Sequence, residues 1–199
     1  MTTILGLTGG IATGKSTVSA FFKSKDIPVI DADVVARQVV KIDSAGLRQI
    51  IAAFGPRFLN VDHSLNRKQL GELVFTHPDK LTELNEIMQP LIANEVQRQI
   101  STFKQLKVPL VVLDAPLLFE QHYENVVDLI MVVTTTPAIQ LDRLMKRNQL
   151  SQKNAEKRIS AQWSLIEKEK RADVVIDNSR SIEATNQQVV EWLEINHLV

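Results

Sequence analysis

The eight residues from Gly9 to Ser16 place the strongest constraint on the fold of this chain. They read Gly-Gly-Ile-Ala-Thr-Gly-Lys-Ser and fit the pattern Gly-x-x-x-x-Gly-Lys-Ser/Thr, between a short apolar run and a segment with helical spacing. In that context the glycines let the backbone turn tightly and direct several N–H groups at phosphate oxygens, and the helix N-terminus adds a partial positive charge. The pattern predicts a phosphate-binding loop; a plain turn between strand and helix is the alternative.

Each residue of this loop has an expected role. Lys15 is predicted to reach the β- and γ-phosphates of a nucleotide, and Ser16 to ligate magnesium through its hydroxyl. ATP and Mg²⁺ are therefore the expected cofactors. The residues expected to bind the nucleotide in this segment are Gly10, Ile11, Ala12, Thr13, Gly14, Lys15, Ser16 and Thr17.

Short apolar runs separated by helix-like segments predict the core of the fold. Such runs, each bounded by turn residues, read as buried strands of a parallel sheet. They are Ile4–Leu7, Pro28–Ile30, Leu110–Leu113, Leu129–Val133 and Val174–Ile176. The fold class is therefore α/β, a three-layer P-loop NTPase-type fold with a five-stranded parallel sheet.

Two longer excursions from this alternation predict additional helical parts. About eighty residues separate the second and third runs, far more than a simple crossover needs. Helical apolar spacing within them is found at Ala45–Phe54, Lys68–Val74 and Pro78–Thr102, where Pro90 should kink or break the last helix. The second excursion follows Thr136-Pro137, a capping pair, and is very polar, as in a helical lid. We expect the core at 1–34, 105–140 and 170–199, a helical acceptor domain at 35–104 and the lid at 141–169.

Acidic residues end two of the predicted strands. Asp31-Ala32-Asp33 closes the second run, and strand alternation would direct both carboxylates to one face, at the sheet edge where ligands bind. Asp33 is the candidate general base for an attacking hydroxyl, although either Asp could instead N-cap the next helix, and the spacing does not decide. Asp114 ends the third run and is the candidate second magnesium ligand, or else a turn former.

The predicted lid is basic on one helix face. Arg143 and Arg147 are spaced i, i+4 and are the candidate ligands of the transferring phosphoryl group, because guanidinium groups bind phosphate in a planar, bidentate way. The alternative is a solvated helix in which Asp142 and Glu156 pair with the cations. Trp163 is expected to pack the lid.

Charge and cysteine content restrict the partners. Lys plus Arg and Asp plus Glu number 23 each, so no global field favours nucleic acid or an anionic membrane. The chain has no cysteine and shows neither a secretory signal nor a long apolar span. We expect a cytoplasmic protein that acts on a small molecule, as a monomer or weak oligomer, without nucleic-acid or membrane partners.

Five strings in order along the chain resemble the dephospho-CoA kinase family. The first alone marks any P-loop protein, and the others together are specific to the family. They are Leu7–Ile11 with Gly14–Thr17, Val29–Asp33, Pro116–Glu120, Gln140–Arg143 with Arg147, and Ala172–Asn178.

This resemblance implies transfer of the γ-phosphoryl group of ATP to the ribose 3′-hydroxyl of dephospho-CoA, giving coenzyme A and ADP. It implies that Asp33 is the base, that the helical insertion binds CoA, that the lid arginines close over ATP, and that Asn178 lies in a segment approaching the nucleotide base. Two positions depart from the family pattern. Ala12 stands where Gly is usual, which adds a Cβ but should still permit the fold because φ there need not be positive. Gln89 precedes Pro90 where His is common, which puts any role of that His in doubt.

Three other functions are alternatives for a sequence of this pattern. Another small P-loop kinase, acting on a nucleoside, nucleotide or sugar acid, would share the loop and lid but not the acceptor-side strings. A GTP-dependent switch would need a guanine-reading Asn-Lys-x-Asp string, which the sequence lacks. An inactive ATP-binding scaffold would bind ATP without turnover in the presence of an acceptor.

Overall fold

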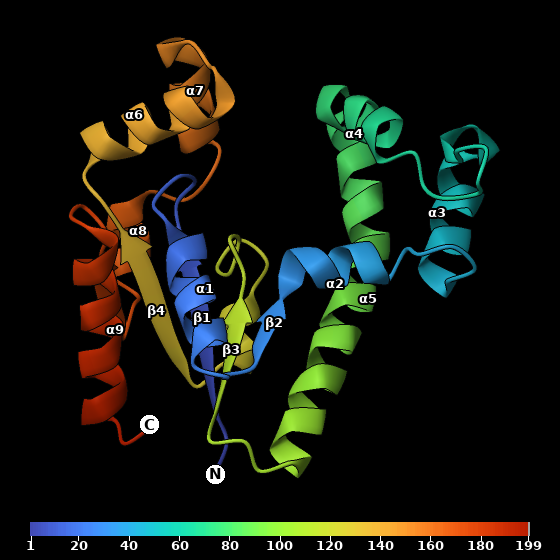
Figure 1. The fold of residues 1–199 in the computed structure, drawn as a ribbon. Helices are drawn as coiled ribbons and strands as arrows, with labels where there is room; N and C mark the ends of the chain where they lie inside the picture. The colour runs from blue at the N-terminus through green and yellow to red at the C-terminus, as the bar shows by residue number, and fades with distance from the viewer. Residues whose placement is uncertain (199) are drawn as a thin grey trace. The chain divides into compact units, whose positions relative to one another are not determined.

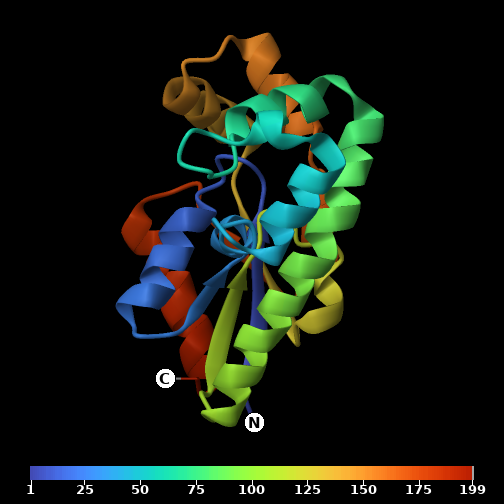
Figure 2. The ribbon, with the colours of Figure 1, turned by 90° about the vertical axis from the view of Figure 1, so that its right-hand side faces the viewer.

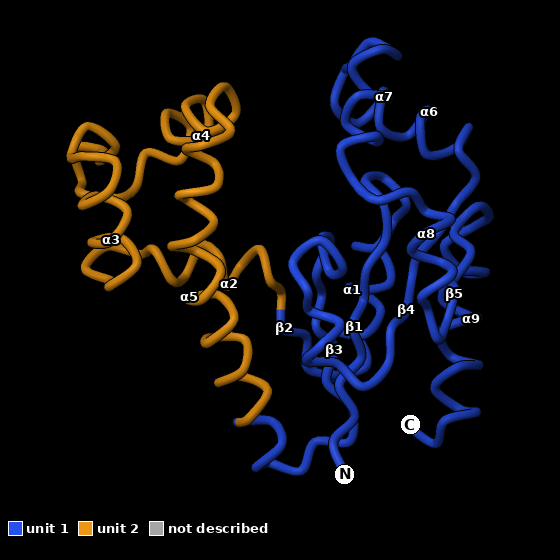
Figure 3. The backbone as a smooth tube through the Cα atoms, turned by 180° about the vertical axis from the view of Figure 1, so that it is seen from behind, with its two compact units in different colours: residues 1–30, 102–199 blue, residues 31–101 orange. Residues whose placement is uncertain are grey.

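A computed structural model describes residues 1–198 and divides them into two compact units. Unit 1 contains residues 1–30 and the chain from residue 102 onward, and unit 2 contains residues 31–101 (Figure 3). Within the described residues, no helix is long and apolar enough to cross a membrane.

The sheet has five strands in the order β2-β3-β1-β4-β5 (Figure 1). Their bounds are β1 Thr3–Gly9, β2 Val29–Asp31, β3 Leu110–Asp114, β4 Leu129–Thr134 and β5 Val174–Asp177. Strand β1 pairs in parallel with β3 and β4, so that Leu5 lies between Val112 and Leu129, and β4 pairs in parallel with β5. The predicted parallel α/β core is confirmed, with each strand within two residues of its expected bounds.

Five helices and one short 3₁₀ turn accompany the sheet in unit 1. They are α1 Lys15–Ser24, α6 Pro137–Asn148, α7 Gln152–Ser160, α8 Leu165–Glu169, α9 Ile182–Ile195 and η2 Tyr123–Val126. Helices α1 and α9 contact each other on one face of the sheet (Figure 2). Thr136 caps α6 as predicted, since its Oγ1 accepts a hydrogen bond from Ile139 N at 3.3 Å, with Pro137 at the first helical position.

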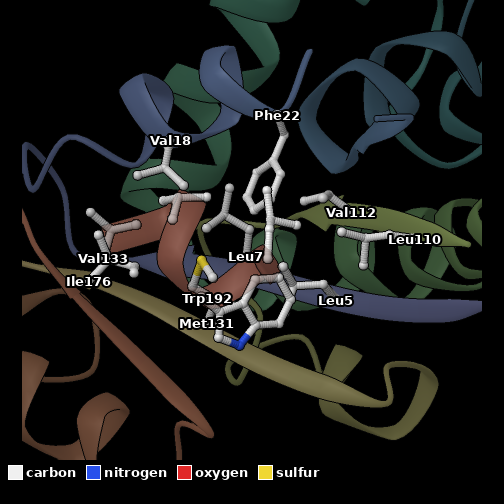
Figure 4. Packing of buried hydrophobic residues seen from close by; sticks show 12 residues of the cluster. Leu5, Leu7, Val18, Phe22, Leu110, Val112, Met131, Val133, Ile176 and Trp192 are labelled. Carbon is white, nitrogen blue, oxygen red and sulfur yellow. The ribbon is translucent and has the colours of Figure 1, made fainter. Parts of the chain in front are cut away.

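The core of unit 1 is formed by strand residues facing α1 and α9. Leu5 and Leu7 of β1 are fully buried and pack with Phe22 of α1 and with Trp192 of α9 (Figure 4). Truncation of a buried side chain of this size to Ala costs about 3–5 kcal/mol. The strands are apolar on both faces because the sheet is covered by other elements, which is why the apolar runs are continuous rather than alternating.

Unit 2 is helical apart from the end of β2. Its elements are α2 Ala32–Gln38, α3 Ala45–Phe54, η1 Pro56–Phe58, α4 Arg67–Thr76 and α5 Pro78–Gln105, the last of which runs on into unit 1. A second core joins these elements, in which Ile50, Phe54 and Phe58 are buried. The three helices expected in the insertion are confirmed.

Pro90 does not break α5, which is continuous from Pro78 to Gln105. A proline inside a helix removes one backbone hydrogen bond and costs about 3 kcal/mol. Leu84, Ile87 and Met88, in the turns before Pro90, pack on the core of unit 2. This packing offsets the local cost, so the possibility that the helix ends at Pro90 is wrong.

Candidate active site

The loop between β1 and α1 adopts a tight turn at the carboxyl end of the sheet. Thr13 closes the turn because its backbone N and its Oγ1 both donate to Gly10 O, at 3.2 and 2.9 Å. Gly14 is the N-cap of α1, with φ at 92°, and it supplies no side chain to cap the helix. The first N–H groups of α1 therefore have no side-chain acceptor from the cap and are available to an anion.

Gly14 is required by both its backbone and its surroundings. A φ of 92° lies where side chains are strained, and a Cβ built there would lie 1.7 Å from Asn178 Nδ2. No side chain larger than hydrogen fits without moving Asn178.

Ala12 has φ at 63° and so lies in the left-handed region. The expectation that φ at this position is not positive is therefore wrong. An L-residue there costs roughly 1–2 kcal/mol relative to its right-handed conformation. The loop keeps its conformation despite this cost, because the next two residues, Thr13 and Gly14, are held in place by hydrogen bonds and by Asn178.

Asn178 holds the phosphate-binding loop in place, although it lies far from the loop in sequence. It is buried, its Nδ2 donates to Thr13 O at 2.7 Å, and its Oδ1 accepts from Thr185 Oγ1 at 2.8 Å. Asn178 follows β5, where Ser179 N donates to Asp177 Oδ1 at 2.8 Å and so forms a turn. Sequence reasoning missed Thr185, which is fully buried in α9.

Lys15 and Asp114 form an ion pair in unit 1. Asp114 ends β3, and its side chain is almost completely buried. Ser16, in the first turn of α1, is exposed. The structure thus brings the predicted lysine and one predicted magnesium ligand together, with the other ligand next to Lys15 in sequence.

The residues at this loop fit Mg²⁺ rather than a metal held by a full protein cage. No group of three or more His, Cys, Asp or Glu residues with metal-binding geometry occurs within residues 1–198. One hydroxyl and one carboxylate are a suitable donor set for Mg²⁺, which usually keeps waters and takes its remaining ligands from substrate phosphates.

The segment expected to form a lid is docked on the loop through two glutamines. Gln140 Nε2 of α6 donates to Ile11 O at 2.9 Å, and Ile11 N donates to Gln162 Oε1 at 2.8 Å. Both hydrogen-bonding groups of Ile11 are thus satisfied by residues more than a hundred positions away. Neither glutamine was assigned a role from the sequence, although Gln140 begins one of the strings that resemble the family.

The two candidate arginines of α6 differ in environment. Arg143 has a buried Nη1 atom with no hydrogen-bond partner among the described residues, so this group is available to an anion. Arg147 is exposed, and its Nε donates to Asn148 Oδ1 at 2.9 Å. Asp142 pairs with Lys146, at 2.9 Å, and not with either arginine.

A buried lysine, Lys168, contacts the start of the phosphate-binding loop. Lys168 of α8 is fully buried, and its Nζ lies 3.0 Å from Glu120 Oε1, 3.1 Å from Pro116 O and 3.5 Å from Gly9 O. Burial lowers the pKa of Lys168, and the hydrogen bond and charge of Glu120 oppose that change. Sequence reasoning gave Lys168 no role, because nothing in its local pattern distinguishes it from the other lysines of the polar segment.

Trp163 packs within unit 1, as expected. Its ring stacks on Phe119 with centroids 5.6 Å apart, and its backbone N donates to Glu120 Oε1 at 3.1 Å. The guanidinium of Arg171 lies over the indole, 4.7 Å from its centroid. The Pro116–Glu120 string therefore connects β3 to the α7–α8 segment.

A pocket of about 480 Å³ lies beside the start of α1, between α1 and α9. Ser16 and Thr17 line it from α1, and Asn186 lines it from α9. Asn186 Oδ1 is buried and has no hydrogen-bond partner among the described residues. Asn186 is a further candidate for contact with the nucleotide that sequence reasoning missed.

The two acidic residues near the end of β2 have different local roles. Strand β2 ends at Asp31, which caps α2 by accepting from Val34 N at 3.0 Å. Asp33 lies in the first turn of α2, where it is exposed and makes no hydrogen bond or ion pair within the described residues. The expectation that strand alternation aligns both carboxylates is wrong, because the backbone is already helical at Ala32.

Comparison with known proteins gives consistent similarities in sequence. A family model described as dephospho-CoA kinase matches residues 3–184. The chain is 46% identical to a dephospho-CoA kinase of Enterococcus faecalis over 194 residues, covering 98% of this chain and 97% of that protein. It is 47% identical to a dephospho-CoA kinase of Oceanobacillus iheyensis over 194 residues, covering 98% of each.

Solved structures show the same similarity in fold. The chain resembles a Thermus thermophilus protein with a TM-score of 0.82 at 29% identity, covering 98% of this chain and 97% of that one. It resembles dephospho-CoA kinase from Campylobacter jejuni with a TM-score of 0.76 at 28% identity, covering 98% and 96%. Shikimate kinase from Bacteroides thetaiotaomicron, with a TM-score of 0.53 and 17% identity over 96% and 98%, shares the fold alone.

Proposed function

The chain belongs to the dephospho-CoA kinase family, and from that premise we propose how its residues perform the transfer. Members of this family phosphorylate dephospho-CoA at the expense of ATP, in the synthesis of coenzyme A, and this chain is a kinase of that kind. The acceptor atom we propose is the oxygen of the ribose 3′-hydroxyl, which takes the γ-phosphoryl group and leaves ADP. Action on another nucleoside or nucleotide is not favoured by these similarities.

The loop from Gly10 to Thr17 binds the ATP phosphates in this proposal. Support comes from the uncapped N-terminus of α1 and from the tight turn fixed by Thr13. Lys15 leaves Asp114 on nucleotide binding and contacts the β- and γ-phosphates, which releases the Asp114 carboxylate. Ser16 and Asp114 would hold Mg²⁺, which, when bound, neutralises charge on the β- and γ-phosphate oxygens.

Asp33 is the proposed general base. Its carboxylate is exposed and unpaired within the described residues, so it is free to accept a hydrogen bond from the 3′-hydroxyl and then its proton. Asp31 is occupied as the cap of α2. In this proposal, therefore, Asp31 acts as the cap and Asp33 as the base.

Arg143 and Arg147 are the proposed ligands of the transferring phosphoryl group. The buried, unpartnered Nη1 of Arg143 supports this role, because an unsatisfied buried guanidinium group is costly unless an anion completes it. Arg147 is one helical turn further along α6. Closure of this segment over ATP remains a prediction.

Asn178 acts on the nucleotide through the loop in this proposal. Its side-chain amide is engaged by Thr13 and Thr185, so its support for binding is the conformation of residues 13 and 14. That the segment at Asn178 also approaches the nucleotide base remains a prediction. So do a cytoplasmic location, a monomeric or weakly associating state and the absence of nucleic-acid partners.

The observation that carries the proposal is the P-loop itself, with Lys15 at the start of α1 and paired to Asp114 of β3. The test is ADP release by the purified chain with ATP and Mg²⁺, comparing dephospho-CoA with adenosine, AMP and buffer, with mass analysis of the product. Turnover stimulated by dephospho-CoA alone, with coenzyme A as product, is expected. Preference for another acceptor would refute the substrate assignment but not the P-loop chemistry.

Asp33→Asn tests the base directly, and Asp31→Asn is its matched control. Both changes remove one carboxylate, but Asn at position 31 still caps α2. Asp33→Asn should lower kcat by about 100- to 10,000-fold, the usual contribution of a positioned base, with the KM for ATP unchanged. Full activity in Asp33→Asn would remove Asp33 from the mechanism.

A further inference from the structure

Both backbone groups of Ile11 are held by glutamine side chains from outside the phosphate-binding loop. Gln140 of α6 is buried, and its Nε2 donates to Ile11 O at 2.9 Å. Gln162 lies between α7 and α8, and its Oε1 accepts from Ile11 N at 2.8 Å. The peptide groups before and after Ile11 are thus fixed by two side chains that have no part in the proposed contacts with phosphate, magnesium or acceptor.

The space around Gly10 shows how closely α6 approaches this backbone. A Cβ built on Gly10 would lie 2.7 Å from Gln140 Nε2 and 3.1 Å from Leu165 Cδ2. Gln140 therefore packs directly against the loop as well as hydrogen-bonding to it. A large change in the backbone at Gly10 or Ile11 would break these hydrogen bonds or clash with these side chains.

Ala12, with φ at 63°, lies between two fixed residues. Ile11 is held by the glutamines, and on the other side Thr13 N donates to Gly10 O at 3.2 Å while Thr13 O accepts from Asn178 Nδ2 at 2.7 Å. A residue with a Cβ is more stable outside the left-handed region, so Ala12 would leave this conformation if either neighbour were released. A glycine would remain there without such support.

The backbone that carries each glutamine is itself held in place. Gln140 N donates to Thr136 O at 2.9 Å in the first turn of α6. Gln162 precedes Trp163, whose ring stacks on Phe119 with centroids 5.6 Å apart. The two amide groups therefore meet Ile11 without further ordering of the main chain, and their hydrogen bonds are available to oppose the strain at Ala12.

We propose that Gln140 and Gln162 are positioning residues that hold Ala12 in its left-handed conformation and so keep the N–H groups of the loop directed at the ATP phosphates. The inference rests on the proposed function, in which this loop binds ATP. The segment from α6 to α8 supplies by side-chain contacts the support that a glycine at position 12 would make unnecessary. The alternative is that the glutamines only tie this segment to the rest of unit 1, in which case their removal lowers stability and leaves phosphate affinity unchanged.

The first test replaces each glutamine by Met, which has a similar length and forms no strong hydrogen bond. Gln140→Met and Gln162→Met should each raise the Kd of Mg·ATP about 5- to 30-fold, which is the cost of one left-handed residue expressed as a ratio of affinities. Inorganic tripolyphosphate with Mg²⁺ should lose affinity by the same factor, because it carries the phosphates without base or sugar.

Gln152→Met is the matched control for both variants. Gln152 is exposed on α7, and its Nε2 donates to Glu156 Oε1 at 2.8 Å, so this change also removes one hydrogen bond of a glutamine amide. It should leave the Kd of Mg·ATP and of tripolyphosphate unchanged.

Steady-state kinetics separate positioning from a general loss of structure. The KM for ATP should rise in Gln140→Met and Gln162→Met, whereas kcat at saturating ATP and the KM for dephospho-CoA should change by less than about twofold, because the lost contact acts on ATP binding in the ground state and transition state alike. A general loss of structure would lower kcat or raise both KM values together.

Rescue by Ala12→Gly is the most specific readout. Glycine enters the left-handed region at no steric cost, so each glutamine substitution should weaken Mg·ATP binding by less than about threefold in a chain that also carries Ala12→Gly. The cycle of single and double variants measures this coupling between residue 12 and each glutamine. Contacts that only tie two segments together predict the same factor with and without Ala12→Gly.

The outcomes separate this inference from the proposed function. If the unaltered chain binds neither Mg·ATP nor Mg·tripolyphosphate, the proposed function fails. If it binds both and the glutamine variants keep full affinity, or if Ala12→Gly does not reduce their losses, the positioning role is overturned while the function stands. Circular dichroism melting checks that the variants fold, and Gln162→Met carries the test if Gln140→Met does not fold, because Gln162 is only half-buried.

Discussion

The hydroxyl of Thr185 supports the phosphate-binding loop through one side chain, and its removal has a calculable effect. Thr185 Oγ1 donates to Asn178 Oδ1 at 2.8 Å, and Asn178 Nδ2 donates to Thr13 O at 2.7 Å. Thr185→Val replaces the hydroxyl by a methyl group of similar size. It leaves Asn178 Oδ1 buried without a donor, which costs about 1–3 kcal/mol.

This cost predicts both a stability change and an affinity change. For a chain of 150–250 residues, 1 kcal/mol shifts the melting temperature by about 2–4 °C, so Thr185→Val should melt about 2–12 °C lower. The affinity for Mg·ATP should fall by at most about 150-fold, since each 1.4 kcal/mol is a factor of ten. Asn178→Ala should have a larger effect, because Thr13 O also loses its donor.

The assay that tests this reasoning measures binding of ATP and of inorganic tripolyphosphate, each with Mg²⁺, to the unaltered chain and to both variants. Tripolyphosphate has no base, so loss of loop conformation should weaken both ligands by the same factor. Thr185→Ser keeps the hydroxyl and is the matched control, with near-normal affinity expected. A loss confined to ATP would refute the argument, because it would mean that Asn178 acts on the base and not on the loop.

Three further predictions follow from local features of unit 1 and unit 2. Ala12→Gly should raise the melting temperature by about 2–4 °C, because it removes roughly 1 kcal/mol of left-handed strain at φ 63°; a lower melting temperature would contradict this. Lys168→Met should lower the free energy of unfolding in urea by about 3–5 kcal/mol, because it leaves Glu120 unpaired. The double variant Lys168→Met with Glu120→Gln should recover part of this loss. A double variant as unstable as Lys168→Met would count against the ion pair. Hydrogen bonds from Arg98 and then Gln99 lower the pKa of Glu95 to about 2, so its contribution to stability is present above about pH 4.5 and is lost as pH falls toward 2. This contribution should not exceed about 0.5 kcal/mol, because the Glu95–Arg98 pair is near the surface. In Glu95→Gln the free energy of unfolding should therefore fall less steeply between pH 4.5 and pH 2, by that amount. An unchanged pH dependence would show that the pair makes no such contribution.

The fold could be predicted largely from the sequence because its signals are local. Continuous apolar runs such as Leu110–Leu113 mark strands buried on both faces, and the glycine-rich loop needs only its own residues to be recognised. Helix α3 begins and ends at its predicted residues, with Ser44 accepting from Leu47 N at 3.1 Å. Pro90 shows the limit of local rules, since tertiary packing keeps α5 continuous across it.

The site could be predicted only as far as its residues act locally. Asp33 was selected by its position near a strand end, and the alternation argument behind its orientation fails because α2 begins at Ala32. The contacts that shape the loop join residues far apart in sequence, as from Asn178 to Thr13 and from Gln140 to Ile11. Each of these pairs depends on the strand order of the sheet, which brings the ends of β1, β4 and β5 together.

Lys168 illustrates the same point in energetic terms. A lysine in a charged stretch is predicted to be solvated, because burial of an isolated ammonium group is very unfavourable. It is buried here because Glu120, Pro116 O and Gly9 O converge on its Nζ from two other segments. Only the assembled sheet brings those acceptors together. The sequence around Lys168 therefore carries no pattern that predicts its burial, whereas the loop that Lys168 supports can be recognised from eight consecutive residues.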